Sequence, residues 1–434
     1  MLEIYEVCVI IISIILAINS IKKTVKVDKT IYLVHLLFFF VFVLPLIMDY
    51  VFGFPSYSSL FYGFNISYND APTRYVYATY ILLSQIIMLI VGNNRFRFSN
   101  KKYRSMHDLP RVNNIKNLHS SSNSMSDFLM FGASIITVVL VVVFPMSKEI
   151  LWNFGWRDLG VSIVGQKYYS TVEKLSYISI VSAIIFLFKK QRKIITKVFF
   201  ITIITMSICV QAKRSIIFFA GVLIISYLLF NTKMSNRKWI YLLGTFIIIT
   251  FLLYSIYVKI TYRDYIGFES IYTTLRIDFF RDDTVKMVIH SLLYPNTWQV
   301  LEYPGQSIIT QIGSLFPLQF LHVPSMGYNS YLTSALIGVP VEKSINWMTT
   351  SIFDEMIANF GFLGFWIAPT ILGIFAKIAD RQNNRLIPIT IAVIMLLMMY
   401  SPSYIMWFIQ FWLLIVIVER VFRAKRRVGS SSSN

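Results

Sequence analysis

Runs of mostly apolar residues, each close to the length of a bilayer-crossing helix, recur along this chain of 434 residues. About 20 such residues span the hydrocarbon core of a bilayer, where the backbone must satisfy its own hydrogen bonds. Helices meet that requirement, and 56% of the residues are hydrophobic, so we expect an all-α polytopic integral membrane protein. We predict eleven spans, at 3–20, 31–48, 75–92, 128–146, 173–188, 198–212, 215–230, 240–258, 360–376, 386–401 and 403–418.

The net charge of +19 would suit a nucleic-acid partner, but the placement of the basic residues gives another explanation. These residues gather in every second connector between the predicted spans. The basic stretches are 22–29, 95–116, 189–197, 233–238, 377–385 and 420–427. This alternation is the positive-inside pattern. We therefore expect the N-terminus outside, the C-terminus in the cytoplasm, and no nucleic-acid partner.

One long segment, 259–359, is too mixed and too polar to span a bilayer. It holds nine of the 21 acidic residues, five of the 13 prolines and two of the 5 histidines. Its acidic excess and its place in the alternation put it on the outer side. The chain then divides into eight spans over 1–258, a large extracytoplasmic loop with short helices over 259–359, three spans and a basic tail over 360–428, and a low-complexity tail over 429–434.

Within this loop, the pattern predicts one helix over 274–292. Arg276, Asp283 and His290 recur every seven residues and would share a face. That face is either functional or simply solvated, with Asp282 and Lys286 paired four residues apart. Residues 294–327 contain four prolines and are typical of an irregular or re-entrant connection.

Two cations stand out between predicted spans six and seven. Lys213 and Arg214 lie on the outer side with almost no connector to hold them in water. Charge at membrane depth is costly and usually marks a ligand or a pathway. A lipid-linked phosphate or pyrophosphate would be a suitable counter-ion, since a guanidinium binds two of its oxygens at once. The alternative is that both side chains extend to the lipid headgroups.

The end of the loop combines hydroxyl groups with carboxylates. Thr349, Thr350 and Ser351 precede Asp354 and Glu355, which run directly into predicted span nine. A carboxylate in a partly dry cleft can serve as a general base. The alternative is that Glu355 only marks the membrane boundary. The two histidines of the loop, His290 and His322, are either proton carriers or structural residues.

No metal or cofactor site is expected. The chain lacks a metalloprotease helix motif, a phosphate-binding glycine loop, a dinucleotide fingerprint and a nucleophile elbow. Cys8 and Cys209 both fall inside predicted spans, so no thiolate site is indicated. The aromatic-rich outer connector 49–74 is either an interfacial aromatic belt or a stacking surface for sugar rings.

Two short stretches, together with the topology, carry a resemblance to a known family. Lys213-Arg214-Ser215 opens a span, and Glu355 is followed by Asn359-Phe360-Gly361 and Gly364 after the large outer loop. Together with the topology, these stretches resemble the bacterial polysaccharide repeat-unit polymerases (the Wzy group) of the superfamily that includes the O-antigen ligases. A third stretch, 327–332, is similar to the ligases' H-N-x-Y-L, but Tyr328 stands where their histidine would be. That departure argues against a ligase.

The resemblance implies an enzyme, a metal-independent glycosyltransferase at the outer face of the bacterial cytoplasmic membrane. It would transfer a growing glycan from undecaprenyl pyrophosphate to another lipid-linked repeat unit, building O-antigen, capsule or exopolysaccharide. Membrane lipid, a chain-length regulator and a flippase would be its partners. The expected site residues are Lys213, Arg214, Arg276 and Arg281 for the pyrophosphate, Glu355, His322 or His290 for the acceptor's proton, and Tyr328, Asn329, Thr349 and Thr350 for the substrate.

Three other functions stay open. A metal-dependent transferase would need an acidic residue in the first outer connector, where Asp70 stands without a neighbouring carboxylate, and chelator sensitivity would distinguish it. A lipid-linked oligosaccharide flippase or other transporter usually has two similar halves, which this sequence lacks. An O-antigen ligase would use lipid A core as the acceptor.

Overall fold

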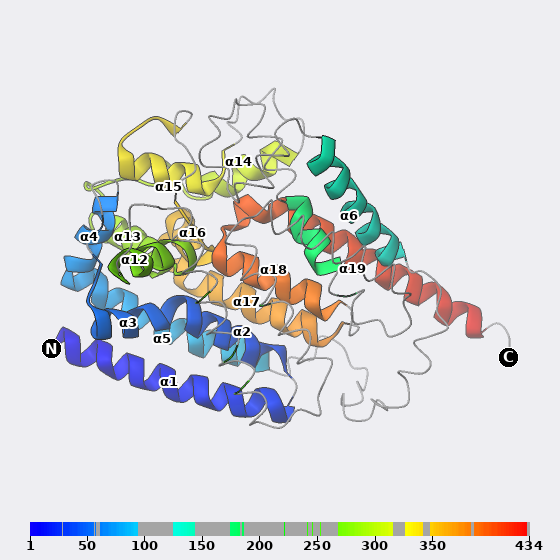
Figure 1. Cartoon of the computed structure of the whole chain (residues 1–434), viewed down its shortest axis with the longest axis horizontal. Coiled ribbons are helices and arrows are strands. Elements are labelled where there is room, and N and C mark those ends of the chain that lie inside the picture. The colour runs from blue at the N-terminus through cyan, green and yellow to red at the C-terminus, as the bar shows by residue number, and fades with distance from the viewer. Residues whose placement is uncertain are drawn as a thin grey trace. The chain divides into compact units, whose positions relative to one another are not determined.

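The computed structural model (Figure 1) describes residues 1–27, 29–55, 57, 61–93, 125–143, 174–182, 185, 221, 241, 245, 252, 268–315, 326–341, 348–382 and 386–431. Over these residues the structure is all-helical, with no β-strand. The chain forms two compact units. The first comprises Met1–Gly92 with Gln211–Ile409, and the second comprises Asn93–Val210 with Gln410–Asn434.

Five helices in the described part of the chain are long and apolar enough to cross a membrane. They are Leu2–Thr24, Thr30–Phe52, Ala71–Asn93, Ile352–Asp380 and Pro402–Val421, and they match predicted spans one, two, three, nine and eleven. Two shorter apolar helices, Phe128–Val139 and Ile387–Met399, match predicted spans four and ten. Predicted spans five to eight lie largely outside the described residues, so the count of eleven stays a prediction.

The N-terminal part of the first unit is a set of apolar helices. These are α1 (Leu2–Val27), α2 (Thr30–Phe38), the π-helix η1 (Phe39–Val43), α3 (Leu44–Phe52) and α5 (Ala71–Asn93). The widened turn of η1 ends two residues before Pro45, whose missing N–H interrupts the regular helical hydrogen bonding. A short helix, α4 (Tyr62–Asn69), precedes α5, and the two are joined by Asp70.

Polar side chains connect three of these apolar helices. His35 of α2 contacts the Ser20 hydroxyl at 3.1 Å through Nδ1 and the Gln85 carbonyl at 3.0 Å through Nε2. The Gln85 amide in turn donates to Ser13 at 2.7 Å. Between apolar helices in lipid there is little hydrophobic driving force, so such hydrogen bonds help to fix the helices against one another. The chain of contacts therefore joins α1, α2 and α5.

The C-terminal part of the first unit contains α17 (Gly364–Asp380), α18 (Ile387–Met399) and the start of α19 (Pro402–Ser431). Every residue of α18 is buried, and the helix is apolar on all sides. A helix with this composition belongs to the interior of a packed bundle. It packs against α17 and α2. With 13 residues, α18 is shorter than the five helices of spanning length. Its apolar composition, which suits burial against protein as well as lipid, is the reason that the sequence predicts a span here.

The described part of the long polar segment contains five helices: α12 (Phe268–Phe279), α13 (Asp282–Leu293), α14 (Gln306–Leu315), α15 (Tyr328–Ile337) and α16 (Ile352–Phe360). The prediction of one helix over 274–292 is wrong, because the helix breaks at Phe280 and Arg281. Arg281 donates to the carbonyl oxygens of Ile277, Asp278 and Phe280, which closes the C-terminal end of α12. The predicted connection at 294–327 is irregular only in part, since it contains α14.

The junction between α16 and α17 explains the glycines of the Asn359-Phe360-Gly361 stretch. Ser351 and Asp354 form a capping box that begins α16. The helix ends at Gly361, whose φ of 56° is strained for any residue with a Cβ atom. At Gly364, a Cβ atom would lie 2.3 Å from the Met356 carbonyl oxygen. The chain therefore turns from α16 into α17 with a backbone approach that only glycine permits.

This close approach predicts a large cost for a small substitution. We expect Gly364→Ala to destabilise the protein by about 1–3 kcal/mol, because the backbone of α16 has to move. Gly132→Ala is the control, since nothing lies within 4 Å of a Cβ atom there, and it should be neutral or stabilise by up to ~1 kcal/mol. The measurement is the thermal unfolding midpoint of both variants in one detergent. Equal midpoints for Gly364→Ala and the wild type would contradict the packing.

In the second unit, α6 (Met125–Val143) packs against helical residues 174–182. The Ser179 hydroxyl donates to Thr137 Oγ1 at 2.9 Å, and the Ser182 hydroxyl donates to the Met130 carbonyl oxygen at 3.2 Å. Small hydroxyl residues at the contact of two apolar helices allow close approach and supply hydrogen bonds. This is the packing expected of helices that cross a bilayer.

Candidate functional site

The first feature of the site is a fully buried carboxylate, Glu355, in α16. Its Oε1 atom accepts a hydrogen bond from the Ser307 hydroxyl of α14 at 2.7 Å, and Oε2 accepts from the Ser403 backbone N–H of α19 at 3.3 Å. The Ser403 hydroxyl accepts from the Tyr328 backbone N–H of α15 at 2.9 Å. One side chain is thus held by groups from α14 and α19, and through Ser403 it is connected to α15.

Asn359 completes this arrangement from the next turn of α16. Its Nδ2 group donates to the Ser307 hydroxyl oxygen and to the Glu355 carbonyl oxygen, each at 2.8 Å. Because Ser307 accepts from Asn359, its single hydroxyl hydrogen is directed at Glu355. The asparagine therefore orients the serine that binds the carboxylate. This gives a physical reason for Glu and Asn at a spacing of four.

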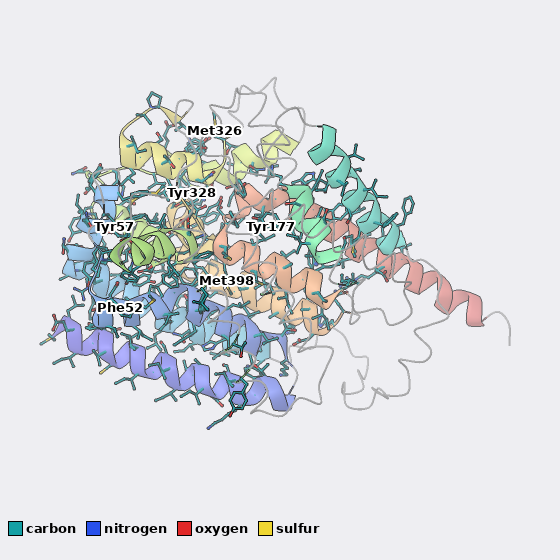
Figure 2. The ribbon with its side chains drawn as sticks, in the orientation of Figure 1. Phe52, Tyr57, Tyr177, Met326, Tyr328 and Met398 are labelled. Atoms are coloured by element: carbon teal, nitrogen blue, oxygen red, sulfur yellow. The ribbon has the colours of Figure 1, made fainter. Side chains whose placement is uncertain are left out.

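Three buried polar atoms on the residues around Glu355 have no hydrogen-bond partner in the described structure: Tyr328 Oη, Asp354 Oδ2 and Asn359 Oδ1. Each unsatisfied group costs about 1–3 kcal/mol, so such a concentration calls for an explanation. Burial, and then the charges of Asp354 and Glu355, raise the pKa of Tyr328 well above its ordinary value. Tyr328 (Figure 2) therefore keeps its proton and has an unused O–H to donate.

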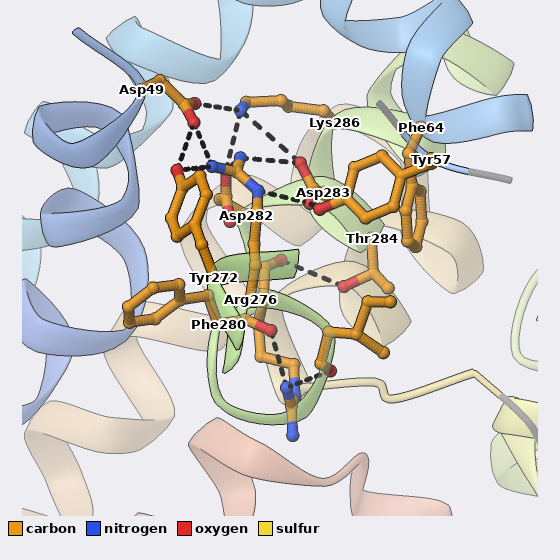
Figure 3. Close-up of polar contacts among 12 residues, drawn as sticks. Asp49, Tyr57, Phe64, Tyr272, Arg276, Phe280, Asp282, Asp283, Thr284 and Lys286 are labelled. Carbon is orange, nitrogen blue, oxygen red and sulfur yellow. Dashed lines mark hydrogen bonds and ion pairs between the residues drawn. The ribbon is translucent and has the colours of Figure 1, made fainter. Parts of the chain in front are cut away.

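The second feature is a buried charged cluster made by Asp49, Arg276, Asp282, Asp283 and Lys286 (Figure 3). Arg276 donates from Nε to Asp283 at 2.7 Å and from Nη2 to both Asp282 and Asp283. Its Nη1 group donates to Asp49 and to the Tyr272 hydroxyl. All five N–H groups of this guanidinium are therefore used within the protein.

Lys286 supports the same carboxylates. Its Nζ atom lies 2.7 Å from Asp282 Oδ2, so the predicted Asp282–Lys286 pair is confirmed, but the pair is buried rather than solvated. Two cations face three carboxylates, which leaves one negative charge in excess. Burial raises the pKa of Asp282, and the Asp283 charge adds to the rise against the attraction of Arg276. Burial alone would raise the pKa of Asp283 too, but Arg276 holds it below its ordinary value.

The two arginines predicted to bind pyrophosphate from the loop are thus engaged inside the protein. Arg276 has no free donor, and Arg281, also fully buried, donates to the Met399 carbonyl oxygen at 3.0 Å and to the end of α12. A phosphate could reach Arg276 only by displacing a carboxylate. Both guanidinium groups are therefore occupied by partners within the protein, and their contact with pyrophosphate stays a prediction.

Of the other predicted site residues, some lie near Glu355, one lies in another cluster, and three are outside the described residues. Asn329 adjoins Tyr328 in α15, and Thr349 and Thr350 are buried just before α16, where Thr349 donates to the Ile277 carbonyl oxygen at 2.9 Å. His290 contacts Asp70 rather than any member of the Glu355 site. Lys213, Arg214 and His322 lie outside the described residues. Glu355 lies three residues after the start of the candidate span Ile352–Asp380, so it is close to one end of that span.

Sequence reasoning missed the serines that hold Glu355 and the aspartate that completes the charged cluster. Ser401 and Ser403 flank Pro402, where α19 begins after the apolar helix α18, and this polar break was the available signal. Asp49 lies near the end of an otherwise apolar candidate span, where an ionisable residue marks a functional or structural role by default. Ser307 had no distinguishing signal in its surroundings.

The described residues contain no group of three or more His, Cys, Asp or Glu side chains that could hold a metal ion. Apolar helices of spanning length indicate a helical, membrane-embedded protein, and the Glu355 site is built where its polar segment meets those helices. Comparison with known proteins finds no matching family model, no matching curated protein and no matching solved structure.

Proposed function

We propose that this protein polymerises lipid-linked oligosaccharide repeat units. It transfers a glycan from undecaprenyl pyrophosphate to a hydroxyl of a second lipid-linked unit, on the extracytoplasmic side of the bacterial cytoplasmic membrane. The observation that carries the proposal is the burial of the Glu355 carboxylate without a cationic partner among the described residues. Glu355 is fully buried, and no described lysine or arginine forms an ion pair with it.

The contrast with the charged cluster makes this observation specific. Asp282 and Asp283 are also buried, but each forms ion pairs with Arg276 or Lys286. A buried charge without a counter-ion is costly, and a fold without another use for it would place an apolar or amide residue there. Carboxylates of this kind recur as general acids and bases in active sites. The motif around Glu355 and Asn359, which resembles that of the repeat-unit polymerases, agrees with such a role.

The proposed step is an inverting glycosyl transfer. The acceptor hydroxyl oxygen bonds to the anomeric carbon, the bond from that carbon to the pyrophosphate oxygen breaks, and Glu355 takes the acceptor's proton. The lipid pyrophosphate leaves with the bonding electron pair. Its negative charge is stabilised by Arg214, with Lys213, and neutralising this charge is the larger contribution because pyrophosphate is already a good leaving group. The unused Tyr328 hydroxyl donates to a substrate oxygen.

Deletion of the gene tests the function directly. We expect the deletion strain to export single repeat units in place of long chains, as seen on a polysaccharide ladder gel, and the plasmid-borne gene to restore the ladder. The purified protein in proteoliposomes should convert lipid-linked repeat units into polymer, and a chelator should leave this activity unchanged. Loss of all exported glycan would indicate a flippase, and chelator sensitivity would indicate the metal-dependent alternative.

The assignment of the pyrophosphate ligand has its own test. Arg214→Ala should abolish long chains in the deletion host, because the leaving group's charge is no longer neutralised. Arg237→Ala is the matched control, since Arg237 belongs to a predicted cytoplasmic connector and should support a normal ladder. Both variants are compared at equal membrane abundance. A normal ladder from Arg214→Ala would reject this residue's role and leave the role of Glu355 intact.

A further inference from the structure

A second cluster of polar and aromatic side chains lies apart from the Glu355 site, where α4 packs against α13 (Figure 1). Asp70 joins α4 to α5, and its Oδ2 atom accepts from the Thr73 backbone N–H at 3.0 Å and from the Thr73 hydroxyl at 2.6 Å. These bonds cap the first turn of α5. They also fix the direction of the carboxylate.

His290 of α13 completes a hydrogen-bonded relay with these residues. Its Nδ1 atom lies 3.1 Å from Thr73 Oγ1 and 3.5 Å from Asp70 Oδ2. The single hydroxyl hydrogen of Thr73 is already donated to Asp70, so Thr73 accepts from an N–H on Nδ1. When the imidazole is neutral, its lone pair is therefore on Nε2. Within the described chain, Nε2 has no hydrogen-bond partner.

Aromatic rings surround the imidazole. The ring centroid of Tyr294 lies 4.6 Å from that of His290, and the centroid of Trp298 lies 5.2 Å from it. Tyr62 of α4 meets Trp298 edge-on at 6.4 Å. Tyr294 and Tyr62 remain 38% and 43% exposed, whereas Trp298 is only 6% exposed. Two accessible rings thus stand beside an ordered group of polar atoms.

Two of these polar groups have unused hydrogen-bonding capacity. Trp298 Nε1–H is buried without a partner in the described structure, and His290 Nε2 offers a lone pair. Asp70 adds a charged acceptor. Burial alone would raise the pKa of Asp70, but the hydrogen bonds from the Thr73 hydroxyl and backbone N–H lower it, so the carboxylate stays ionised. Among the described residues, its Oδ1 atom accepts from the Tyr294 hydroxyl, at 3.2 Å, and from no other donor.

We infer that Tyr62, Asp70, His290, Tyr294 and Trp298 form a saccharide-binding subsite. A pyranose ring has an apolar C–H face that packs on an aromatic ring, together with hydroxyl groups that both donate and accept. The exposed tyrosines offer the packing surface, Asp70 and His290 Nε2 offer acceptors, and Trp298 offers a donor. An interfacial aromatic belt would explain the tyrosines, but it would not require the Asp70–Thr73–His290 relay.

The identity of the saccharide rests on the proposed function: the ligand would be the oligosaccharide of a repeat unit, held at a distance from the pyrophosphate. No hydrogen bond or ion pair joins this cluster to Glu355 in the described structure. The subsite therefore binds sugar independently of the transfer step. It would hold either the acceptor unit or the growing chain.

The test measures binding without the lipid carrier. Repeat-unit oligosaccharide is released from the host's lipid carrier by mild acid, labelled at its reducing end with a fluorophore, and titrated with the full-length protein in nanodiscs by fluorescence polarisation. We expect Tyr62→Ala and Tyr294→Ala each to weaken binding about tenfold. Tyr303→Ala is the matched control, because Tyr303 is 45% exposed and lies in the same polar segment. It should change the affinity less than twofold.

The outcomes separate the two proposals. Wild-type binding that Tyr62→Ala and Tyr294→Ala leave unchanged, or a wild-type protein that does not bind the oligosaccharide, would overturn the subsite, while polymer formation in proteoliposomes would still support the polymerase. Selective loss of binding in these two variants, from a protein that forms no polymer, would support the subsite and reject the proposed function. Equal weakening by Tyr303→Ala would also overturn the subsite.

Discussion

Arg276→Ala is expected to lower the free energy of unfolding by about 3–5 kcal/mol, enough to remove most of the folded protein from the membrane. Arg276 is the cation shared by Asp49, Asp282 and Asp283. Removing it leaves three buried carboxylates facing Lys286 alone. Breaking a buried network in this way costs far more than losing an exposed ion pair, which contributes about 0–1 kcal/mol.

The measurement is the thermal unfolding midpoint in detergent, together with the amount of protein recovered from membranes. Arg420→Ala is the control, because Arg420 is exposed on α19 and its loss should change stability by less than about 0.5 kcal/mol. Asp283→Asn, combined with Arg276→Ala, tests the cause. If unpaired charge dominates, the double variant loses less stability than the sum of the two single losses. Additive losses, or a stable Arg276→Ala protein, would contradict the network.

Only part of the charged cluster could be predicted from the sequence. The Asp282–Lys286 pair follows from a spacing of four on one helix, so a local pattern predicted it. Its burial depends on Asp49, which lies 227 residues before Arg276 in the chain. No local pattern reports such a contact. The seven-residue recurrence likewise predicted Arg276 and Asp283 together, but His290, further along α13 than Asp283, contacts Thr73 and Asp70 instead.

The same limit applies to the spans and to the Glu355 site. Apolar windows predicted five helices of spanning length, because lipid selects for composition as well as structure. They also predicted α18, whose apolar surface is covered by protein. The stretch from Glu355 to Gly364 could be recognised in the sequence because its glycines and its asparagine make contacts with residues close to them in the chain. Ser307 and Ser403 each lie 48 residues from Glu355, and ordinary serines at that separation have no sequence signal.

Glu355→Gln is expected to abolish polymer formation while leaving the protein folded. The amide keeps the volume of the side chain and can still accept a hydrogen bond from Ser307. It cannot take a proton from the acceptor hydroxyl, and loss of a general base typically lowers the rate by about 10²–10⁴-fold. The measurement is the rate of polymer formation in proteoliposomes at equal protein content. Glu302→Gln, which changes an exposed acid of the same segment, should leave that rate unchanged.

Stability should respond in the opposite direction to that of the Arg276 variant. No described cation neutralises Glu355, so replacing the carboxylate with a neutral amide removes an uncompensated buried charge. The unfolding midpoint should stay the same or rise, as is common where a site exchanges stability for activity. A purely structural carboxylate would give a lower midpoint with activity lost only in proportion to the folded protein. An active Glu355→Gln enzyme, or one that unfolds, would therefore remove Glu355 from the proposed chemistry.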